Sequence, residues 1–137
     1  MINENIKALI SYRLSQADES IKAAKTLLRE RLLASAVNRA YYAMFYAVLA
    51  LLALGKKETS KHSGAISLFD REYVKTGVFS KELSKWLHEA FDLRQRSDYA
   101  VKYEPSDEEA EEIINKAVAF VSQVEERLNT DMGNLDR

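Results

Sequence analysis

Hydrophobic side chains recur along the first part of the chain in steps of three and four residues. This is the period of one face of an α-helix, and it predicts a helix from about residue 3 to residue 30. The opposite face is charged and is expected to lie in water. The apolar positions are Ile6, Ile10, Leu14, Ala17, Ile21, Ala24 and Leu28, and the charged ones are Glu19, Lys22, Lys25 and Arg29.

A second segment, AYYAMFYAVLALLAL at residues 40–54, is apolar or aromatic at every position. Its fifteen residues fall short of the roughly 20 that cross a bilayer, and polar residues bound it on both sides. The pattern therefore predicts a helix buried on most sides and no membrane span. Gly55 follows directly and is predicted to end this helix in the left-handed conformation.

Three further helices are predicted in the second half of the chain. One covers about residues 60–74, and a fourth starts after Ser80 as N-cap and runs into the charged stretch FDLRQRSDYAVKYEP at residues 91–105. Pro105 stops helix continuation, and Ser106 with Glu109 has the spacing of a capping box for a fifth helix. That helix keeps its apolar rhythm until a polar tail from about residue 130. Its apolar positions are Ala110, Ile113, Ala117, Val121, Val124 and Leu128.

The expected fold is all-α: a single domain over residues 1–137, built as an antiparallel up-and-down bundle of about five helices. A chain of 137 residues suits one core, and one proline with four glycines leaves little material for tight hairpins. We find no internal repeat and no low-complexity segment.

Composition narrows the chemistry. Lys plus Arg number 20 and Asp plus Glu 21, so any contact with nucleic acid has to be a local patch. The absence of cysteine excludes disulfides, a thiolate nucleophile and Cys-type zinc sites, and it fits a reducing cytoplasm. The N-terminal MINENIKALISYR lacks the features of an export signal, so we expect a cytoplasmic location. No metal site or cofactor motif is predicted.

Two constellations lie near the middle of the chain. Asn38, Arg39, Tyr41 and Tyr42 stand at the start of the apolar helix, where they either mark its exit from the core or present donors to a phosphate or a base edge. His62 follows Lys61 at the head of the third helix, where backbone donors favour an anion, although a lone histidine is more often a surface residue. The other histidine, His88, is interpreted as structural.

The charged stretch after the fourth helix offers a third constellation. Arg94 and Asp98 are four residues apart, which on a helix makes an ordinary exposed ion pair. The alternative is that Arg94 binds a phosphate with Asp98 orienting it. Basic side chains interleaved with tyrosines are also typical of single-stranded RNA binding. The residues concerned are Arg94, Arg96, Asp98, Tyr99, Lys102 and Tyr103.

Four segments together resemble a known family. SAVNRAYYAMFYAVLALL, KHSGAISLF, EYVKTG and LRQRSDY occur in the order, and at roughly the separations, seen in small prokaryotic HEPN-domain proteins of the UPF0332-like type. The resemblance spans about Leu9 to Leu128, nearly the whole chain. It implies a helical bundle that commonly forms a homodimer. It also implies a metal-independent endoribonuclease, often a toxin encoded beside a minimal nucleotidyltransferase antitoxin.

The family's catalytic arginine maps onto Arg94, but its histidine does not map. Four to six residues beyond Arg94, where the family places histidine, stand Tyr99, Ala100 and Val101. Cleavage of RNA without metal needs a proton acceptor near neutrality, and tyrosine, with an ordinary pKa of about 10, is a poor one. His62 or Asp98 is therefore a candidate substitute, on the condition that folding or dimerisation brings it within hydrogen-bond reach of Arg94.

The sequence thus predicts a toxin-like module that acts on or binds RNA or nucleotides and is paired with a nucleotidyltransferase. Arg94, Asp98, Tyr99 and His62 are the candidate catalytic residues. Asn38, Arg39, Tyr42 and Arg96 are the candidate nucleotide- or RNA-binding residues. Three alternatives remain open: a catalytically silent nucleotide-binding subunit, a substrate of the partner modified at Tyr99 or Tyr103, and a dimeric scaffold without ligand.

Overall fold

The computed structural model describes residues 3–57, 59, 61–99 and 103–135, and within these ranges it contains helices and no strand. The all-α class is therefore confirmed. Of the residues singled out above, Ala100, Val101 and Lys102 lie outside the described ranges, as does Ser60, the predicted start of the third helix. The elements are α1 (Glu4–Arg29), α2 (Leu33–Leu54), α3 (His62–Phe69), the π-helical turn η1 (Asp70–Val74), α4 (Lys81–Tyr99) and α5 (Asp107–Leu135).

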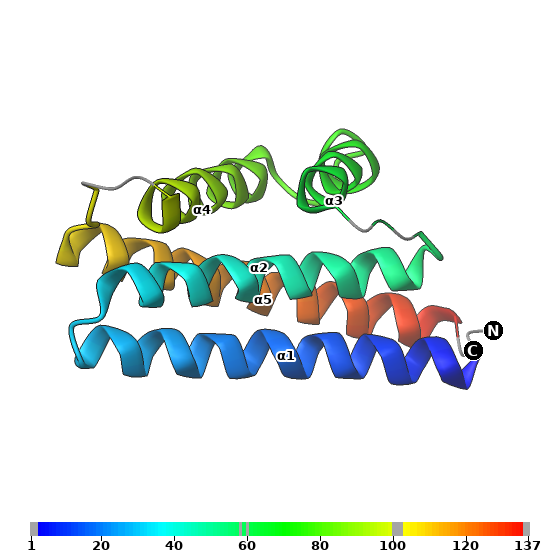
Figure 1. Ribbon diagram of the computed structural model, residues 1–137. Helices are drawn as coiled ribbons and strands as arrows, with labels where there is room; N and C mark the ends of the chain where they lie inside the picture. The colour runs from blue at the N-terminus through cyan, green and yellow to red at the C-terminus, as the bar shows by residue number, and fades with distance from the viewer. Residues whose placement is uncertain (1–2, 58, 60, 100–102, 136–137) are drawn as a thin grey trace.

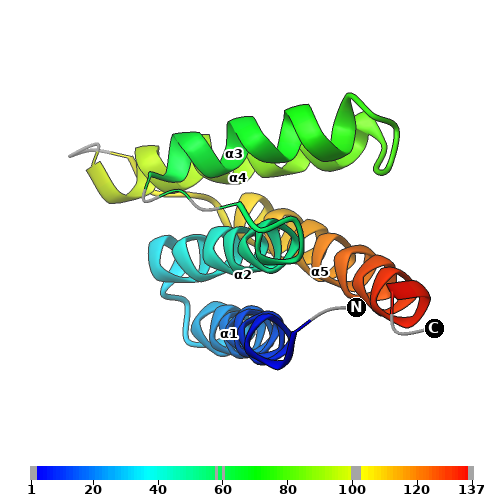
Figure 2. The ribbon, with the colours of Figure 1, turned by 90° about the vertical axis from the view of Figure 1, so that its right-hand side faces the viewer.

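Helix α2 is the centre of the bundle. It contacts α1, α3, α4 and α5, and Figure 1 shows it between α1 on one side and α4 on the other, with α5 alongside. The long helices α1, α2, α4 and α5 run in alternating directions. The segment formed by α3 and η1 is seen end-on in Figure 1 and lengthwise in Figure 2, so it runs across α2. This crossing brings the start of α3 over the middle of the bundle.

The predicted apolar faces are the buried ones. All six apolar positions predicted for α5 lie in the core, and α1 buries Ile10, Ala17 and Ala24. The predicted capping box is present, because Ser106 and Glu109 exchange two hydrogen bonds of 3.0 Å each. A cap that was not predicted begins α1, where Asn3 accepts a hydrogen bond from the Ile6 backbone at 2.9 Å. Helix α5 nevertheless continues to Leu135, past the point where its apolar rhythm stops.

Helix α2 begins earlier than the apolar run suggests. It starts at Leu33, so Asn38 and Arg39 lie inside the helix and do not mark its boundary. By length and composition its 22 residues are enough to cross a membrane, which removes the argument from shortness. Its apolarity has another explanation in the fold, because 56% of its most apolar window is buried inside the bundle. Its length and apolarity are also those of a helix in the core of a bundle.

The prediction for Gly55 was wrong in its conformation. Gly55 has φ −80°, and the left-handed residue is the next one, Lys56, with φ 57°. The backbone N–H groups of Lys56 and Lys57 donate to Ala53 at 3.1 Å and to Leu52 at 2.8 Å, which is a Schellman ending displaced by one residue. Helix α1 ends in the same way, with Arg31 at φ 64°.

Contacts on both sides hold α3 and η1 in place. Tyr73 donates a hydrogen bond of 2.9 Å to the Leu51 carbonyl of α2, and Asp70 binds both Ser84 and His88 of α4 at 2.7 Å. His88 is structural in this respect, as expected. At the start of α3, a Cβ on Gly64 would collide with Thr59 Oγ1, so the residues before His62 pack closely against the helix.

Candidate functional site

Arg94 lies where α4 leaves the core. Ala90 and Leu93 beside it are buried, and the Arg94 side chain itself is only 13% exposed. Its Nε donates to Asp98 Oδ2 at 3.1 Å, one turn along the same helix. The predicted ion pair is therefore present, but it is largely covered, unlike an exposed surface pair. Burial of this kind strengthens the interaction between the charges and holds the guanidinium in one orientation.

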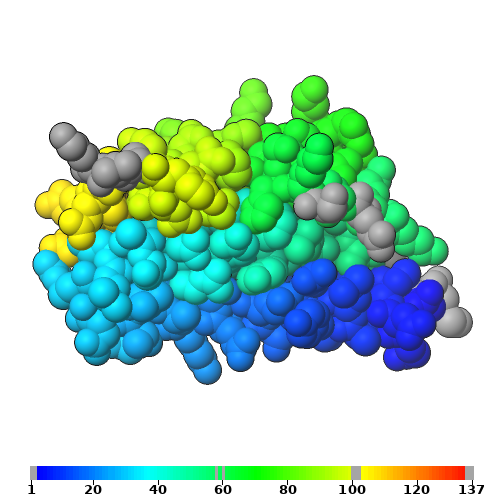
Figure 3. Space-filling model, viewed as in Figure 1, coloured from blue at the N-terminus to red at the C-terminus, as the bar shows by residue number. Residues whose placement is uncertain are grey.

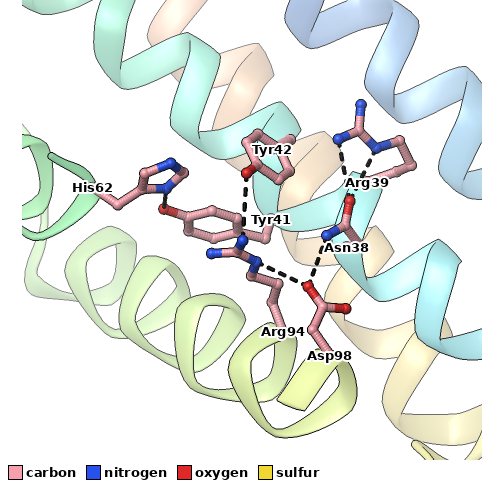
Figure 4. Close-up of polar contacts among 7 residues, drawn as sticks. All are labelled: Asn38, Arg39, Tyr41, Tyr42, His62, Arg94 and Asp98. Atoms are coloured by element: carbon pink, nitrogen blue, oxygen red, sulfur yellow. Dashed lines mark hydrogen bonds and ion pairs between the residues drawn. The ribbon is translucent and has the colours of Figure 1, made fainter. Parts of the chain in front are cut away.

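Helix α2 supplies the second support of the cluster. Asn38 donates from Nδ2 to the same Asp98 Oδ2 at 3.0 Å, and its Oδ1 accepts bonds from Nε and Nη2 of Arg39 at 3.2 and 3.1 Å. The result is an unbroken chain of polar contacts from Arg94 through Asp98 and Asn38 to Arg39, visible in Figure 4. One carboxylate oxygen thus ties α4 to α2.

Tyrosine rings enclose the Arg94 guanidinium. Its central carbon lies 5.4 Å from the ring centre of Tyr41, 5.3 Å from that of Tyr42 and 5.9 Å from that of Tyr99. Nη2 also donates a long hydrogen bond of 3.4 Å to the Tyr42 hydroxyl. Nη1 makes no hydrogen bond among the described residues, and this nitrogen remains free for a ligand.

His62 enters the same cluster from α3. Its Nδ1 lies 2.7 Å from the hydroxyl of Tyr41, and its ring stacks on Phe45 with centres 4.2 Å apart and planes 3° from parallel. Burial lowers the pKa of His62 below its usual value, and the positive charge of Arg94 lowers it further. Burial also raises the pKa of the Tyr41 hydroxyl, and Arg94 opposes this effect. At neutral pH both groups are therefore uncharged.

The direction of the hydrogen bond with Tyr41 depends on which nitrogen of His62 carries a proton. Tyr41 keeps its hydrogen because its pKa is raised, so its hydroxyl can donate to Nδ1 of one neutral tautomer or accept from Nδ1–H of the other. A neutral imidazole that accepts at Nδ1 carries its own hydrogen on Nε2. In this arrangement His62 offers Nε2–H as a donor to a ligand. To act as a base it must adopt the other tautomer, with Tyr41 accepting a bond from Nδ1–H.

The structure brings together seven of the eight candidate residues proposed from the sequence. Arg96 is the exception: its guanidinium lies 5.1 Å from the ring centre of Tyr103, on the side of α4 that faces α5. Tyr103 in turn donates to Glu109 at 2.8 Å. The seven that meet are Asn38, Arg39, Tyr42, His62, Arg94, Asp98 and Tyr99.

Two members of the site were not among the eight candidate residues, although the sequence analysis named Tyr41 with its neighbours on α2. Tyr41 joins His62 to the Arg94 cluster, and Phe45 holds the imidazole ring. They are four residues apart on α2, so one face of the helix presents both, but nothing in the sequence indicated that α3 crosses at this point.

A basic groove begins next to this site. It has a volume of about 1020 Å³ and lies between α1, the end of α2 and the segment before α3. Its described lining contains Arg13, Lys56, Lys57 and Lys61 and no carboxylate, although Lys57 pairs with Glu72 at 3.0 Å. Lys61 directly precedes His62. The local basic patch that a nearly neutral chain would need is therefore present beside the cluster.

The described residues contain no group of three or more His, Cys, Asp or Glu side chains that could hold a metal ion. The cluster instead contains a cation paired with a carboxylate, together with a neutral imidazole and tyrosine rings. A helical bundle with such a cluster is suited to holding an anionic group such as a phosphate.

The chain belongs to the HEPN domain family, whose model matches residues 10–127. A "UPF0332 protein" of Thermotoga maritima is 43% identical over 124 residues, covering 90% of this chain and 93% of the relative. Two proteins of Methanocaldococcus jannaschii carry the name "Putative toxin". MJ0142 is 35% identical over 84% of this chain and 78% of its own length, and MJ0605 is 34% identical over 93% and 95%. The resemblance found in the sequence is thereby confirmed.

Proposed function

We propose that this protein is a HEPN toxin-like module that binds RNA or nucleotides at the Arg94 cluster and works as a homodimer with a minimal nucleotidyltransferase antitoxin. The observation that carries the proposal is the buried, doubly braced Arg94 with a free Nη1 beside the neutral His62. The names of the two archaeal relatives support the toxin-like character. The cations of the adjacent groove support a polyanionic ligand longer than one nucleotide.

In this proposal Arg94 and His62 share one phosphate. The guanidinium Nη1 and the imidazole Nε2–H are both donors, and both border the Tyr41 ring, at 5.4 and 5.7 Å between centres. Asp98 and Asn38 position the arginine, and Tyr99 covers its outer side. Cleavage would further require His62 in its other tautomer, taking the proton of a ribose 2′-hydroxyl through Nε2. His62 thus replaces, from another helix, the histidine absent after Arg94.

The first test is RNA binding by an Arg94→Ala variant, measured by fluorescence anisotropy with a labelled single-stranded RNA. We expect the affinity to fall roughly tenfold or more, because a positioned arginine–phosphate contact is lost. Arg127→Ala is the matched control, since Arg127 forms the same four-residue pair with Asp131 at 3.1 Å on α5. Equal affinity of the wild type and Arg94→Ala would refute the proposal.

Cleavage is tested on the same RNA by gel electrophoresis. A His62→Gln variant keeps a hydrogen-bonding side chain but cannot take up a proton, so we expect it to retain most of the binding and to lose cleavage. If the wild-type protein binds RNA and does not cut it, the function is that of a catalytically silent binding subunit. Cleavage that persists in His62→Gln rules out the histidine as the base.

A second candidate function makes this chain the substrate of the nucleotidyltransferase. Tyr99 favours it, because its side chain borders Arg94 and is 71% exposed, whereas the Tyr103 hydroxyl is already bonded to Glu109. After incubation with the partner and ATP, the intact mass should rise by nucleotidyl units in the wild type and stay unchanged in Tyr99→Phe. An unchanged wild-type mass counts against this function, and modification of Tyr99→Phe counts against Tyr99 as the acceptor.

A further inference from the structure

A small polar hollow lies between α1 and α2. It has a volume of about 270 Å³, enough for one planar ring system. Figure 4 shows the Arg39 side chain of α2 turned toward α1, at the edge of this hollow, while Arg94 approaches from α4. The lining residues are Gln16, Glu19, Ser20, Ala23, Arg39 and Tyr46.

The hollow is connected to the phosphate-binding cluster through Arg39. The guanidinium carbon of Arg39 lies 4.7 Å from the Tyr42 ring centre, and that of Arg94 lies 5.3 Å from the same centre. The two cations are therefore within the span of a single nucleotide. Hydrogen bonds through Asn38 and Asp98 also fix their relative position. A phosphate at Arg94 and a base beside Arg39 can thus belong to one ligand.

The lining groups match a particular base. Arg39 donates from Nε and Nη2 to Asn38, and its remaining guanidinium hydrogens are available to other acceptors. Glu19 has no ion pair among the described residues, so its carboxylate is available to accept. Tyr46 adds a ring face 5.8 Å from the ring of Tyr42. The lining thus includes a donor, an acceptor and an aromatic ring.

We propose that this hollow is a guanine-binding subsite, which rests on the proposed binding of RNA or nucleotides at Arg94. Guanine presents O6 and N7 as adjacent acceptors, which suit an arginine, and N1–H and the N2 amino group as adjacent donors, which suit a carboxylate. Adenine places an acceptor, N1, where guanine has N1–H, so its ring nitrogen would face the Glu19 carboxylate. Uracil and cytosine are smaller and offer no pair of adjacent donors.

Ser20 supports a polar ligand in the hollow. It is 4% exposed and is the one buried polar residue of the described chain, and no hydrogen bond of its side chain is found within that part. Its hydroxyl therefore adds a donor and an acceptor to the lining of the hollow. A base in the hollow would provide a partner for this hydroxyl.

The test compares the binding of GMP, IMP and AMP to the full-length protein by calorimetry. We expect GMP to bind about tenfold or more tightly than AMP, with IMP between them because it lacks the N2 amino group. Glu19→Gln should remove most of the preference for GMP over AMP. Glu126→Gln, the same change at an exposed position of α5, should leave it intact. Arg94→Ala should weaken all three nucleotides alike and keep their ranking.

The outcomes separate this inference from the function on which it rests. Equal binding of GMP and AMP, weakened by Arg94→Ala, together with equal binding of U8 and an octamer with one central G, overturns the guanine subsite and leaves the phosphate site standing. No binding of any nucleotide or RNA overturns both. A second arm compares U8 with an octamer that carries one central G. A preference seen in RNA alone assigns the guanine to an RNA strand, and a preference in both arms assigns it to the free nucleotide as well.

Discussion

Tyr41 controls the chemistry that His62 can offer. It is fully buried, its hydroxyl contacts His62 Nδ1 at 2.7 Å, and its ring borders Arg94. When the hydroxyl donates to Nδ1, the neutral imidazole carries its hydrogen on Nε2, and when the hydroxyl accepts, Nε2 is unprotonated. At the scale of single residues, the proposed function therefore assigns binding and cleavage to the two tautomers of His62.

A pH-dependent stability difference should reveal the environment of His62. Its pKa is lowered in the folded protein, so below about pH 6.5 the unfolded chain binds the proton more tightly than the folded one. This contribution is intact above the ordinary histidine pKa and is lost as the pH falls. We expect the melting temperature to drop more between pH 7 and pH 5 in the wild type than in His62→Gln.

Lys61→Gln is the control for this measurement, because it changes the neighbouring residue without removing a group that titrates in that range. It should show the wild-type response to pH. If His62→Gln and the wild type lose the same amount of stability, His62 is not desolvated as described.

At the scale of elements, α1 and α2 both end with a residue other than glycine in the left-handed conformation, which residue preferences disfavour. Helices α1 and α2 both close with Schellman bonds in which a cationic residue, Arg31 or Lys56, takes the left-handed position. A side chain with a Cβ is strained there, by of order 1 kcal/mol or more. Arg31 also pairs with Asp107 at the start of α5, which ties two ends of the bundle together. Lys56 has no such pair among the described residues.

Lys56→Gly should therefore stabilise the protein. Glycine adopts the left-handed conformation without strain, and after its greater entropy in the unfolded chain is subtracted we expect a gain of roughly 0.5–1 kcal/mol. Urea denaturation measures the change. Lys57→Gly, one residue later, should have the opposite sign, because it removes the ion pair with Glu72 and relieves no positive φ. A loss of stability in Lys56→Gly would contradict this account.

At the scale of the whole molecule, the carboxyl groups of Asp18 on α1 and Glu125 on α5 lie close together where the two helices pack. Burial raises the pKa of Glu125 to about 7, and the hydrogen bond and charge of Asp18 raise it in the same direction. Oε1 of Glu125 is buried without a hydrogen-bond partner in the described chain. The contact between these helices is therefore strongest when Glu125 holds its proton.

This pair predicts a loss of stability as the pH rises. Between the ordinary glutamate pKa and about pH 7 the folded protein holds a proton that the unfolded chain has released. Glu125→Gln cannot ionise, so we expect it to melt a few degrees above the wild type at pH 8 and close to the wild type at pH 5. Glu126→Gln, at the exposed neighbouring position, should follow the wild type at both pH values. Equal melting temperatures at pH 8 would count against the buried pair.

Much of the fold followed from local patterns. The periodicity of α1 and α5 predicted their buried faces, and the spacing of Ser106 and Glu109 predicted a capping box that is present. The predicted start of α2 at the apolar run is later than the observed start at Leu33, because Asn38 and Arg39 interrupt the apolar residues of this helix. The left-handed position was assigned to Gly55 on residue preference, which the backbone hydrogen bonds of the helix end override.

The sequence by itself determined the helices, their buried faces and the pairing of Arg94 with Asp98, because these depend on residues three or four positions apart on one helix. Only the tertiary structure decided that α3 crosses α2 and sets His62 against Tyr41, and that Asn38 reaches Asp98 from 60 residues away. It also decided that the Arg39 side chain points toward α1 while the Arg94 side chain reaches the cluster from α4. Such contacts depend on how helices cross, and helical periodicity specifies the face of a helix but not its partner.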